Sequence, residues 1–453
     1  MRVLLISTYE LGHQPFGLAS PAAWLAELGH RVACKDLAVE SLDANQVHES
    51  DLVAFYLPMH TATRLAAKAI EKVRALNPAA HICCYGLYAP LNEAYLRGIG
   101  AGTILGGEFE AGLVSLLERL GAGSALQTEP LISLDRLQFR VPLRTGLPPL
   151  EKYGRLQTGE SSKQTGYTEA SRGCKHLCRH CPVVPVYQGS FRVVQPDIVL
   201  ADIRQQVAAG AGHISFGDPD FFNGPTHAMR IVDALHRKWP ALSFDATIKI
   251  EHLLKHRELL PRLRDAGCLF VTSAVEAVDD TVLAKLDKGH TRADFIEVAR
   301  AFRSTGLTLA PTFIPFTPWT TRASYRELLD LLRELDLVEH VAPVQLALRL
   351  LIPRGSRLLE LADVQKVLRA FDEPALLYRW QHTDPDGDAL AAQALRIAAK
   401  PGTRREIFGR LWNLVADRPL PEDFYVSPRA AIPHMDEPWF CCAEPTEEQA
   451  AHV

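Results

Sequence analysis

The chain has 453 residues, with 49 Lys and Arg residues against 53 Asp and Glu residues, which gives a formal net charge of -4. This near-neutral balance gives no electrostatic case for nucleic acid as the main partner. Hydrophobic residues make up 47% of the chain and charged residues 23%, so disorder over most of its length is excluded and two or three folded domains are expected.

The first 120 residues alternate between predicted strands and helices. The strands are expected at 3–7, 52–57, 81–85 and 103–105, and the helices at 21–28, 63–76 and 110–120. Ser20 is the expected cap of the first helix, with Pro21 at its first position. Continuous apolar strands separated by helices are typical of a parallel sheet covered on both faces. We therefore predict a doubly wound α/β, Rossmann-like domain at 1–120.

The next segments are a predicted linker and a second α/β unit. Residues 121–160 contain several Gly and Pro residues and are predicted to be the linker. Within 161–365, apolar runs predict six strands at 166–170, 213–216, 243–248, 269–275, 308–314 and 343–351. Six successive strand–helix units predict an open, partial (β/α)6 barrel of the TIM type. Residues 366–453 are predicted to be helical at first and to end in an irregular tail.

Neither a membrane span nor a secretion signal is expected. No apolar run reaches the ~18 residues that cross a bilayer, and the N-terminus lacks the long apolar segment and cleavage site of a signal peptide. The chain has 9 Cys residues, and their odd number and irregular spacing do not indicate a secreted disulfide framework. We expect a cytoplasmic protein without a membrane partner.

Three of the Cys residues are clustered, at Cys174, Cys178 and Cys181, directly after a predicted strand. Thiolate sulfur is the soft ligand that iron–sulfur clusters need, and a [4Fe-4S] cluster usually takes four of them. Three ligands would leave one iron open to an external ligand. The alternative is a structural Cys3His zinc site with His176 or His180 as the fourth ligand. The position at the C-terminal end of a barrel strand, where active sites lie, favours the cluster.

This Cys-x3-Cys-x2-Cys loop, with the preceding segment Glu169-Ala170-Ser171-Arg172-Gly173, resembles the cobalamin-domain-containing branch of the radical S-adenosylmethionine (SAM) superfamily. The resemblance covers residues 1–365 in the order of their elements. It implies that the three Cys residues ligate a [4Fe-4S] cluster whose open iron binds SAM. An electron from the cluster, supplied by a donor such as flavodoxin or ferredoxin, then breaks a carbon–sulfur bond of SAM. The usual product is a 5'-deoxyadenosyl radical.

Further segments of the predicted barrel resemble SAM-contacting segments of this family. Gly217 and Asp218 match the segment that contacts the SAM amino group, and Glu276 matches the acid at the end of the fourth strand. A Gly lets the backbone approach a ligand, and a carboxylate can hold an ammonium group. The alternatives are an ordinary strand-to-helix turn for Gly217 and Asp218, and a solvated carboxylate for Glu276.

The predicted N-terminal domain resembles the cobalamin-binding domain that precedes many radical SAM barrels. The resemblance lies in the turns at Gly86 and at Gly106-Gly107, where Gly would let the backbone approach a large flat cofactor. The chain has no Asp-x-His-x-x-Gly segment, and His13 is a lone loop histidine that we do not expect to be a ligand. Cobalamin is therefore either bound without a protein ligand, or the domain serves packing or substrate recognition.

The C-terminal tail contains adjacent Cys residues, Cys441 and Cys442, in a polar segment flanked by Pro. The sequence Cys-Cys-Ala-Glu-Pro resembles the tail of a radical SAM subgroup in which selenocysteine can replace the second Cys. The resemblance implies reactive thiolates that act on the substrate. The alternative is an incidental exposed pair.

The sequence therefore predicts a radical SAM enzyme that modifies an unidentified small molecule. One alternative is transfer of the 3-amino-3-carboxypropyl group of SAM to a soft acceptor such as trivalent arsenic. Another is a zinc- or cobalamin-binding sensor module without catalysis.

Overall fold

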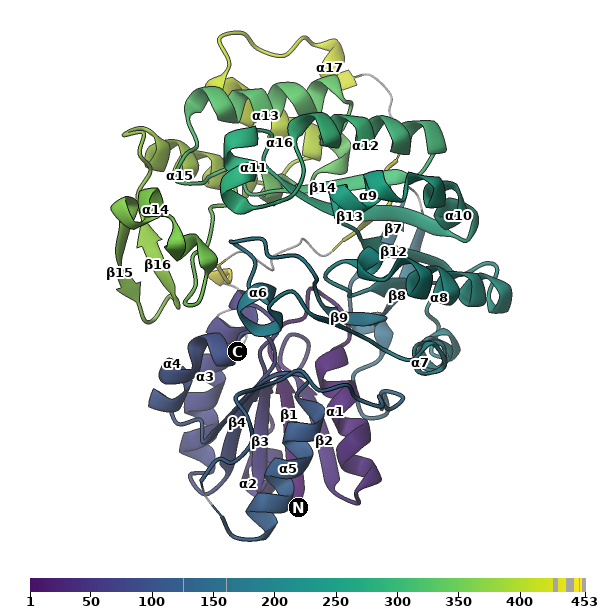
Figure 1. Ribbon diagram of the computed structural model, residues 1–453, viewed down its shortest axis with the longest axis vertical. Helices are drawn as coiled ribbons and strands as arrows, with labels where there is room; N and C mark the ends of the chain where they lie inside the picture. Colours follow the sequence, from purple (N-terminus) through teal and green to yellow (C-terminus); the bar gives the residue numbers. More distant parts are fainter. Residues whose placement is uncertain (125, 160, 427–430, 437–443, 448, 450–453) are drawn as a thin grey trace.

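The computed structural model describes every residue of the chain except 125, 160, 427–430, 437–443, 448 and 450–453. The N-terminal sheet and its helices form one half of the molecule, and a larger curled sheet with its helices forms the other (Figure 1). The short strand β9 (Ser171–Gly173) and helix α6 (Val183–Tyr187) lie between the two halves (Figure 1). This arrangement confirms the predicted fold class.

The N-terminal half is a six-stranded parallel sheet in the order β2-β1-β3-β4-β5-β6. Its strands are β1 (Arg2–Ser7), β2 (Arg31–Asp36), β3 (Leu52–Tyr56), β4 (His81–Tyr85), β5 (Thr103–Gly107) and β6 (Ile132–Ser133). One face packs against α1 (Phe16–Glu27) and α5 (Glu110–Gly121), and the other against α2 (Ala44–Glu49), α3 (His60–Leu76) and α4 (Glu93–Gly98). Two hydrophobic cores, one on each face, explain why these strands are apolar on both sides.

Helix α1 begins five residues earlier than predicted, and Pro21 lies inside it rather than at its start. An interior Pro normally leaves the carbonyl four residues earlier without its helical donor. Here that carbonyl belongs to Gly17, and it accepts a hydrogen bond of 2.9 Å from the Tyr85 hydroxyl of β4. The sheet therefore supplies the donor that Pro21 lacks, which the local sequence pattern could not indicate.

Replacing Gly17 by Ala is expected to destabilise the fold by about 1–3 kcal/mol, because a Cβ atom there would lie 2.1 Å from the Tyr56 ring. Tyr56 packs against Tyr85 and Phe109 and cannot move freely. Thermal and denaturant unfolding measure the loss. Gly98→Ala is the control, since nothing lies within 4 Å of a Cβ atom at Gly98. Equal stability of the two variants would contradict the close packing.

The second half contains a seven-stranded sheet in the order β14-β13-β12-β11-β8-β7-β17. The five parallel strands are β8 (Ser161–Thr168), β11 (His213–Phe216), β12 (Ser243–Thr247), β13 (Cys268–Glu276) and β14 (Thr308–Phe313). Two antiparallel strands, β7 (Arg155–Thr158) and β17 (His434–Met435), extend the β8 edge. The helices and the short strand of this half are α7 (Pro196–Ala208), α8 (Pro225–Lys238), α9 (Ile250–Lys255), α10 (Leu260–Asp265), α11 (Asp280–Leu286), α12 (Arg292–Thr305), α13 (Arg322–Glu334) and β10 (Phe191–Val193).

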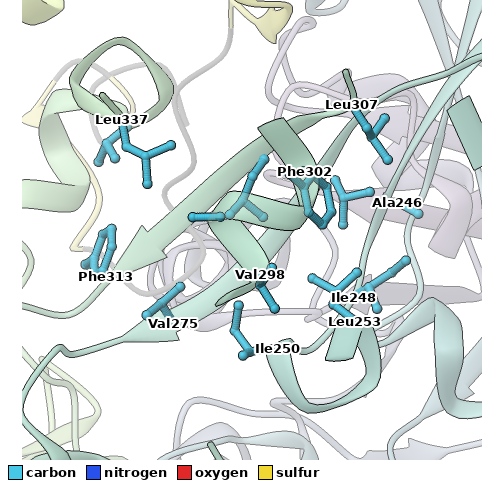
Figure 2. Close-up of a cluster of buried hydrophobic side chains, with 14 of the residues drawn as sticks. Ala246, Ile248, Ile250, Leu253, Val275, Val298, Phe302, Leu307, Phe313 and Leu337 are labelled. Carbon is cyan, nitrogen blue, oxygen red and sulfur yellow. The ribbon is translucent and has the colours of Figure 1, made fainter. Parts of the chain in front are cut away.

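The core of this half lies between the sheet and its helices. Figure 2 shows Val275 of β13 and Phe313 of β14 in one cluster with Val298 and Phe302 of α12. All four side chains are buried. Alternating positions of each strand face this core, which leaves the intervening positions and the strand ends to face the inside of the curled sheet.

The sixth predicted strand, 343–351, differs from expectation. Pro343–Leu346 forms a 3-10 helix, and a single parallel bridge joins Phe316 to Arg349. The Gln345 side chain accepts a hydrogen bond of 3.2 Å from the backbone N–H of Phe313. It therefore replaces the backbone carbonyl that a neighbouring strand would offer at the edge of β14. A side-chain hydrogen bond and one bridge thus stand beyond β14 in place of a full sixth strand, and the barrel stays open.

The segments outside the two sheets also contain more regular structure than predicted. The predicted linker 121–160 contributes β6 to the first sheet and β7 to the second. The region after 365 has an antiparallel hairpin before its helices. Its elements are α14 (Ala362–Val367), β15 (Leu368–Asp372), β16 (Leu377–Trp380), α15 (Gly387–Ala398), α16 (Arg404–Val415) and α17 (Asp423–Val426). No helix of the described residues is long and apolar enough to cross a membrane.

Candidate functional site

The cysteine loop leaves β9 at Gly173, whose φ of +75° few other residues adopt. A Cβ atom at Gly173 would also lie 2.6 Å from the backbone oxygen of Ser190. Cys178 and Cys181 then form a tight turn, in which the N–H of Cys181 donates to the Cys178 carbonyl at 3.2 Å. Both constraints fold the loop back over the end of the barrel.

The three thiols of this loop, Cys174, Cys178 and Cys181, form no disulfide. Burial, with nearby Asp220 and Cys178, raises the pKa of Cys174 to about 11, and burial and the two other thiols raise the pKa of Cys181 as well. These mutual electrostatic effects show that the thiols lie close together. Thiols with a raised pKa, such as Cys174 and Cys181, stay protonated until a metal centre replaces their protons. Three adjacent soft donors without a fourth Cys nearby in the described chain fit a [4Fe-4S] cluster with one open iron.

The two histidines that could complete a zinc site have other partners. The Nε2 atom of His180 lies 3.1 Å from Glu276 Oε1, and the Nε2 atom of His176 lies 3.2 Å from His252 Nε2. Both contacts turn these ring nitrogens toward protein groups. The geometry therefore favours three protein ligands over a closed Cys3His site.

Glu276 ends β13 in a left-handed conformation, with φ at +70°. This strained conformation turns its buried carboxylate toward His180 and toward Lys288 Nζ at 3.4 Å. Burial would raise the pKa of Glu276, but Lys288 and His180 outweigh it and lower the pKa to about 2. Glu276 is thus a fixed negative charge beside the cysteine loop.

Asp218 and Gly217 follow β11 and lie against the strand that leads into the cysteine loop. The Asp218 carboxylate accepts the N–H of Ala170 at 2.9 Å and the hydroxyl of Ser171 at 2.5 Å. Burial raises the pKa of Asp218 to about 7 in spite of these bonds. A Cβ atom at Gly217 would lie 1.9 Å from the Tyr167 hydroxyl, so Gly is required there by the protein itself.

A cavity of about 390 Å³ brings these predicted residues together. Its barrel wall includes Cys181, Gly217, Asp218 and Glu276, while Cys174 and Cys178 lie outside the lining. Its other wall comes from the N-terminal half and is mostly apolar; it consists of Leu11, His13, Tyr56, Pro58, Met59, Leu87, Tyr88, Gly107 and Phe109. A cavity of this volume, mostly apolar with a few convergent polar groups, suits a small molecule such as SAM.

Arg172 joins the two halves and was not singled out from the sequence. It is buried, and its guanidinium lies 2.6 Å from Glu169, 2.8 Å from Glu110 and 3.3 Å from Glu108. Burial opposes the charge on Arg172, but the three carboxylates raise its pKa well above the usual value. The only hint in the sequence was its place in the segment Glu169-Ala170-Ser171-Arg172, since its two other partners, Glu108 and Glu110, lie more than 60 positions away.

The glycines predicted to contact cobalamin are explained by protein contacts. A Cβ atom at Gly107 would lie 2.1 Å from the Ser133 carbonyl of β6, and one at Gly86 would lie 3.0 Å from the Leu57 carbonyl. A Cβ atom at Gly106 would lie 2.6 Å from Pro90. These turns need Gly whether or not a cofactor binds.

His13 lies in the cavity wall, stacked on Tyr167 with ring centroids 4.8 Å apart. Burial lowers its pKa to about 4, so the ring is neutral near pH 7. Its Nδ1 atom has no hydrogen-bond partner within the described part of the chain. His13 is therefore the histidine of the N-terminal half that offers a free nitrogen to a molecule in the cavity.

Cys441 and Cys442 lie outside the described residues. Glu444, two positions later, is described, and its carboxylate contacts Arg64 and lies 3.4 Å from His60 Nε2. Both partners belong to the first turns of α3, directly after Met59 of the cavity wall. The tail is therefore tied at Glu444 to the rim of the cavity.

The chain is similar to several known proteins. The family model described as the radical SAM superfamily matches residues 168–332. Hopanoid C-3 methylase from Methylococcus capsulatus is 27% identical over 326 residues, which cover 68% of this chain and 62% of that protein. A tRNA-2-methylthio-N(6)-dimethylallyladenosine synthase from Desulfosudis oleivorans is 27% identical over 197 residues, or 41% of this chain and 40% of that protein. The chain thus spans less than two thirds of these relatives.

Two solved structures share the fold. The radical SAM methyltransferase TsrM from Kitasatospora setae, with tryptophan and a SAM analogue bound, superposes with a TM-score of 0.65 at 16% identity, covering 88% of this chain and 89% of that one. The cobalamin-dependent SAM radical enzyme OxsB superposes with a TM-score of 0.68 at 15% identity, covering 86% of this chain and 65% of that one. Residues 168–332, which contain the cysteine loop and strands β11 to β14, thus match the radical SAM superfamily, and the two solved structures share the fold of the chain.

Proposed function

We propose that this enzyme holds a [4Fe-4S] cluster through Cys174, Cys178 and Cys181 and reductively cleaves SAM to modify a small molecule. The observation that carries the proposal is the convergence of this loop with Gly217, Asp218 and Glu276 on one cavity of about 390 Å³. When bound and reduced, the cluster supplies the electron that breaks a carbon–sulfur bond of SAM. The reductant is a low-potential donor such as flavodoxin or ferredoxin.

The cavity residues fit the charges of SAM. Glu276 stays ionised, because Lys288 and His180 lower its pKa to about 2, and it faces the cavity. Each oxygen of Asp218 keeps a lone pair after its bond to Ser171 or Ala170, so it can accept an N–H of the SAM amino group. Gly217 leaves room for the Tyr167 hydroxyl, which also lines the cavity.

Cys441 and Cys442 are proposed to act on the substrate. The support is the attachment of Glu444 to Arg64 and His60, which ties the tail to the cavity rim. Two adjacent thiols suit a soft acceptor such as trivalent arsenic, to which the 3-amino-3-carboxypropyl group of SAM would be transferred.

The nucleoside released from SAM tests the proposal. The protein is reconstituted anaerobically, reduced and incubated with SAM, and the products are separated by chromatography. We expect 5'-deoxyadenosine, whereas methylthioadenosine would indicate 3-amino-3-carboxypropyl transfer. Either product should require the reduced cluster. Purification with stoichiometric zinc and no iron or sulfide would instead support a non-catalytic module and reject the proposal.

A second candidate is methyl transfer with cobalamin, because hopanoid C-3 methylase and the methyltransferase TsrM are among the similar proteins. It would release S-adenosylhomocysteine from SAM. The glycines of the N-terminal half that were predicted to contact cobalamin are explained by protein contacts. We assign no described residue to cobalamin and derive no step through that cofactor. Retention of added cobalamin at one equivalent after gel filtration would favour the second candidate.

Lys288 is expected to set the reduction potential of the cluster. It is buried, and its pKa is raised, since Glu276, Cys178 and Cys181 outweigh the effect of burial. Replacing Lys288 by Met removes a positive charge beside the thiolates, so the potential should fall by tens of millivolts. Spectroelectrochemistry of the reconstituted protein measures it. Lys288→Arg keeps the charge and should leave the potential near the wild-type value; a similar fall in both variants would assign Lys288 to packing.

A further inference from the structure

Three polar side chains meet beside the cysteine loop, outside the cavity. His176 comes from that loop, Asp220 from the turn after β11, and His252 from α9. One ligand atom from each residue lies within 4.8 Å of the others. His252 Nδ1 is 2.6 Å from Asp220 Oδ2, and His176 Nε2 is 3.7 Å from the same oxygen. None of the three lines the cavity that holds the proposed SAM site.

Two of these atoms are buried without a hydrogen-bond partner in the described part of the chain. Asp220 and His252 are each 1% exposed. Asp220 Oδ1 accepts the N–H groups of Phe222 and Lys249, but Asp220 Oδ2 and His252 Nδ1 are unsatisfied, because their short contact lacks hydrogen-bond geometry. Leaving a buried carboxylate oxygen without a hydrogen bond is costly. A bound cation would satisfy the oxygen and the ring nitrogen together.

The surrounding charges also favour a cation. Glu251 Oε2 lies 3.5 Å from His176 Nδ1, and it pairs with Lys249 Nζ at 3.1 Å. The two carboxylates, Asp220 and Glu251, therefore outnumber the single ammonium group of Lys249. Two imidazoles and a carboxylate are donors that zinc and other divalent transition metals prefer.

We infer that His176, Asp220 and His252 form a second metal site, which takes one divalent transition ion such as Zn²⁺ and is separate from the cysteine ligands. An ion there would tie the cysteine loop to the turn after β11 and to α9. None of the three residues lines the cavity, so the inference does not rest on the reaction proposed there.

Metal analysis of the full-length chain tests the inference. Reconstituted protein is incubated with equimolar Zn²⁺, desalted, and assayed for zinc, iron and sulfide. We expect one retained zinc per wild-type chain, loss of that zinc in His252→Ala and Asp220→Asn, and unchanged iron and sulfide. His256→Ala is the control, since His256 lies next to α9 and outside the triad; it should retain the zinc.

Two outcomes overturn the site: no zinc retained by the wild type, or equal zinc in the wild type and in the two triad variants. Iron and sulfide report on the cysteine loop separately. If the cluster fails to assemble in every protein, the same comparison is made with Co²⁺ in the cluster-free chain. A cobalt spectrum without sulfur-to-metal charge transfer, lost in His252→Ala, then supports the site. A spectrum unchanged in that variant rejects it.

Discussion

Replacing Cys178 by Ala is expected to abolish assembly of the iron–sulfur cluster and all reductive cleavage of SAM. Cys178 is the middle ligand of the proposed set and the most buried of the three, at 7% exposed. With two thiolates left, the loop cannot hold a cluster that already lacks a fourth protein ligand. Iron and sulfide content, visible absorbance and formation of nucleoside from SAM measure the loss.

Cys268→Ala is the matched control for this prediction. Cys268 is also buried, but it begins β13 and lies in the barrel core, where its Sγ atom contacts the Phe270 carbonyl. Its replacement should cost some stability and leave iron and sulfide at wild-type levels. A Cys178→Ala variant that still assembles an intact cluster would reject the proposed ligand set.

The sequence predicted the elements whose signal is local. Continuous apolar runs identified β1, β3, β4 and β5 in the first sheet, and a strand followed by Cys174 located the cysteine loop. Strand β2 was missed because it lies at the sheet edge, and its residues Arg31–Asp36 are mostly polar or half-exposed. An edge strand of this kind carries neither the apolar run nor a clear alternation.

Features that depend on distant residues could not be predicted. The start of α1 rests on a hydrogen bond from Tyr85, and the edge of β14 is covered by the Gln345 side chain. The triad of His176, Asp220 and His252 joins three separate segments. Each local sequence was compatible with a simpler interpretation, and only contacts between segments distant in the sequence select the observed one.

Replacing Arg172 by Met is expected to destabilise the protein by about 3–5 kcal/mol, because it leaves Glu108, Glu110 and Glu169 buried without their cation. These carboxylates come from both halves, so the loss should also loosen the interface that forms the cavity. Denaturant unfolding measures the free energy. Arg97→Met is the control, since its ion pair with Glu93 is exposed and should contribute less than ~1 kcal/mol.

The pH dependence of the stability lost in Arg172→Met distinguishes two causes. One is the burial of carboxylates without their cation, and the other is the loss of side-chain packing. Burial raises the pKa of Glu108 to about 7 and also raises the pKa of Glu169, although Arg172 lowers both. A carboxyl group with a raised folded-state pKa stabilises the fold below its unfolded pKa, and this stabilisation is lost as the pH rises through the folded-state pKa. Without Arg172 the folded-state pKa values of Glu108 and Glu169 rise further. The fold then continues to lose stability up to a higher pH. The Arg172→Met variant should therefore lose more stability at pH 8 than at pH 5; a loss independent of pH would assign Arg172 to packing alone.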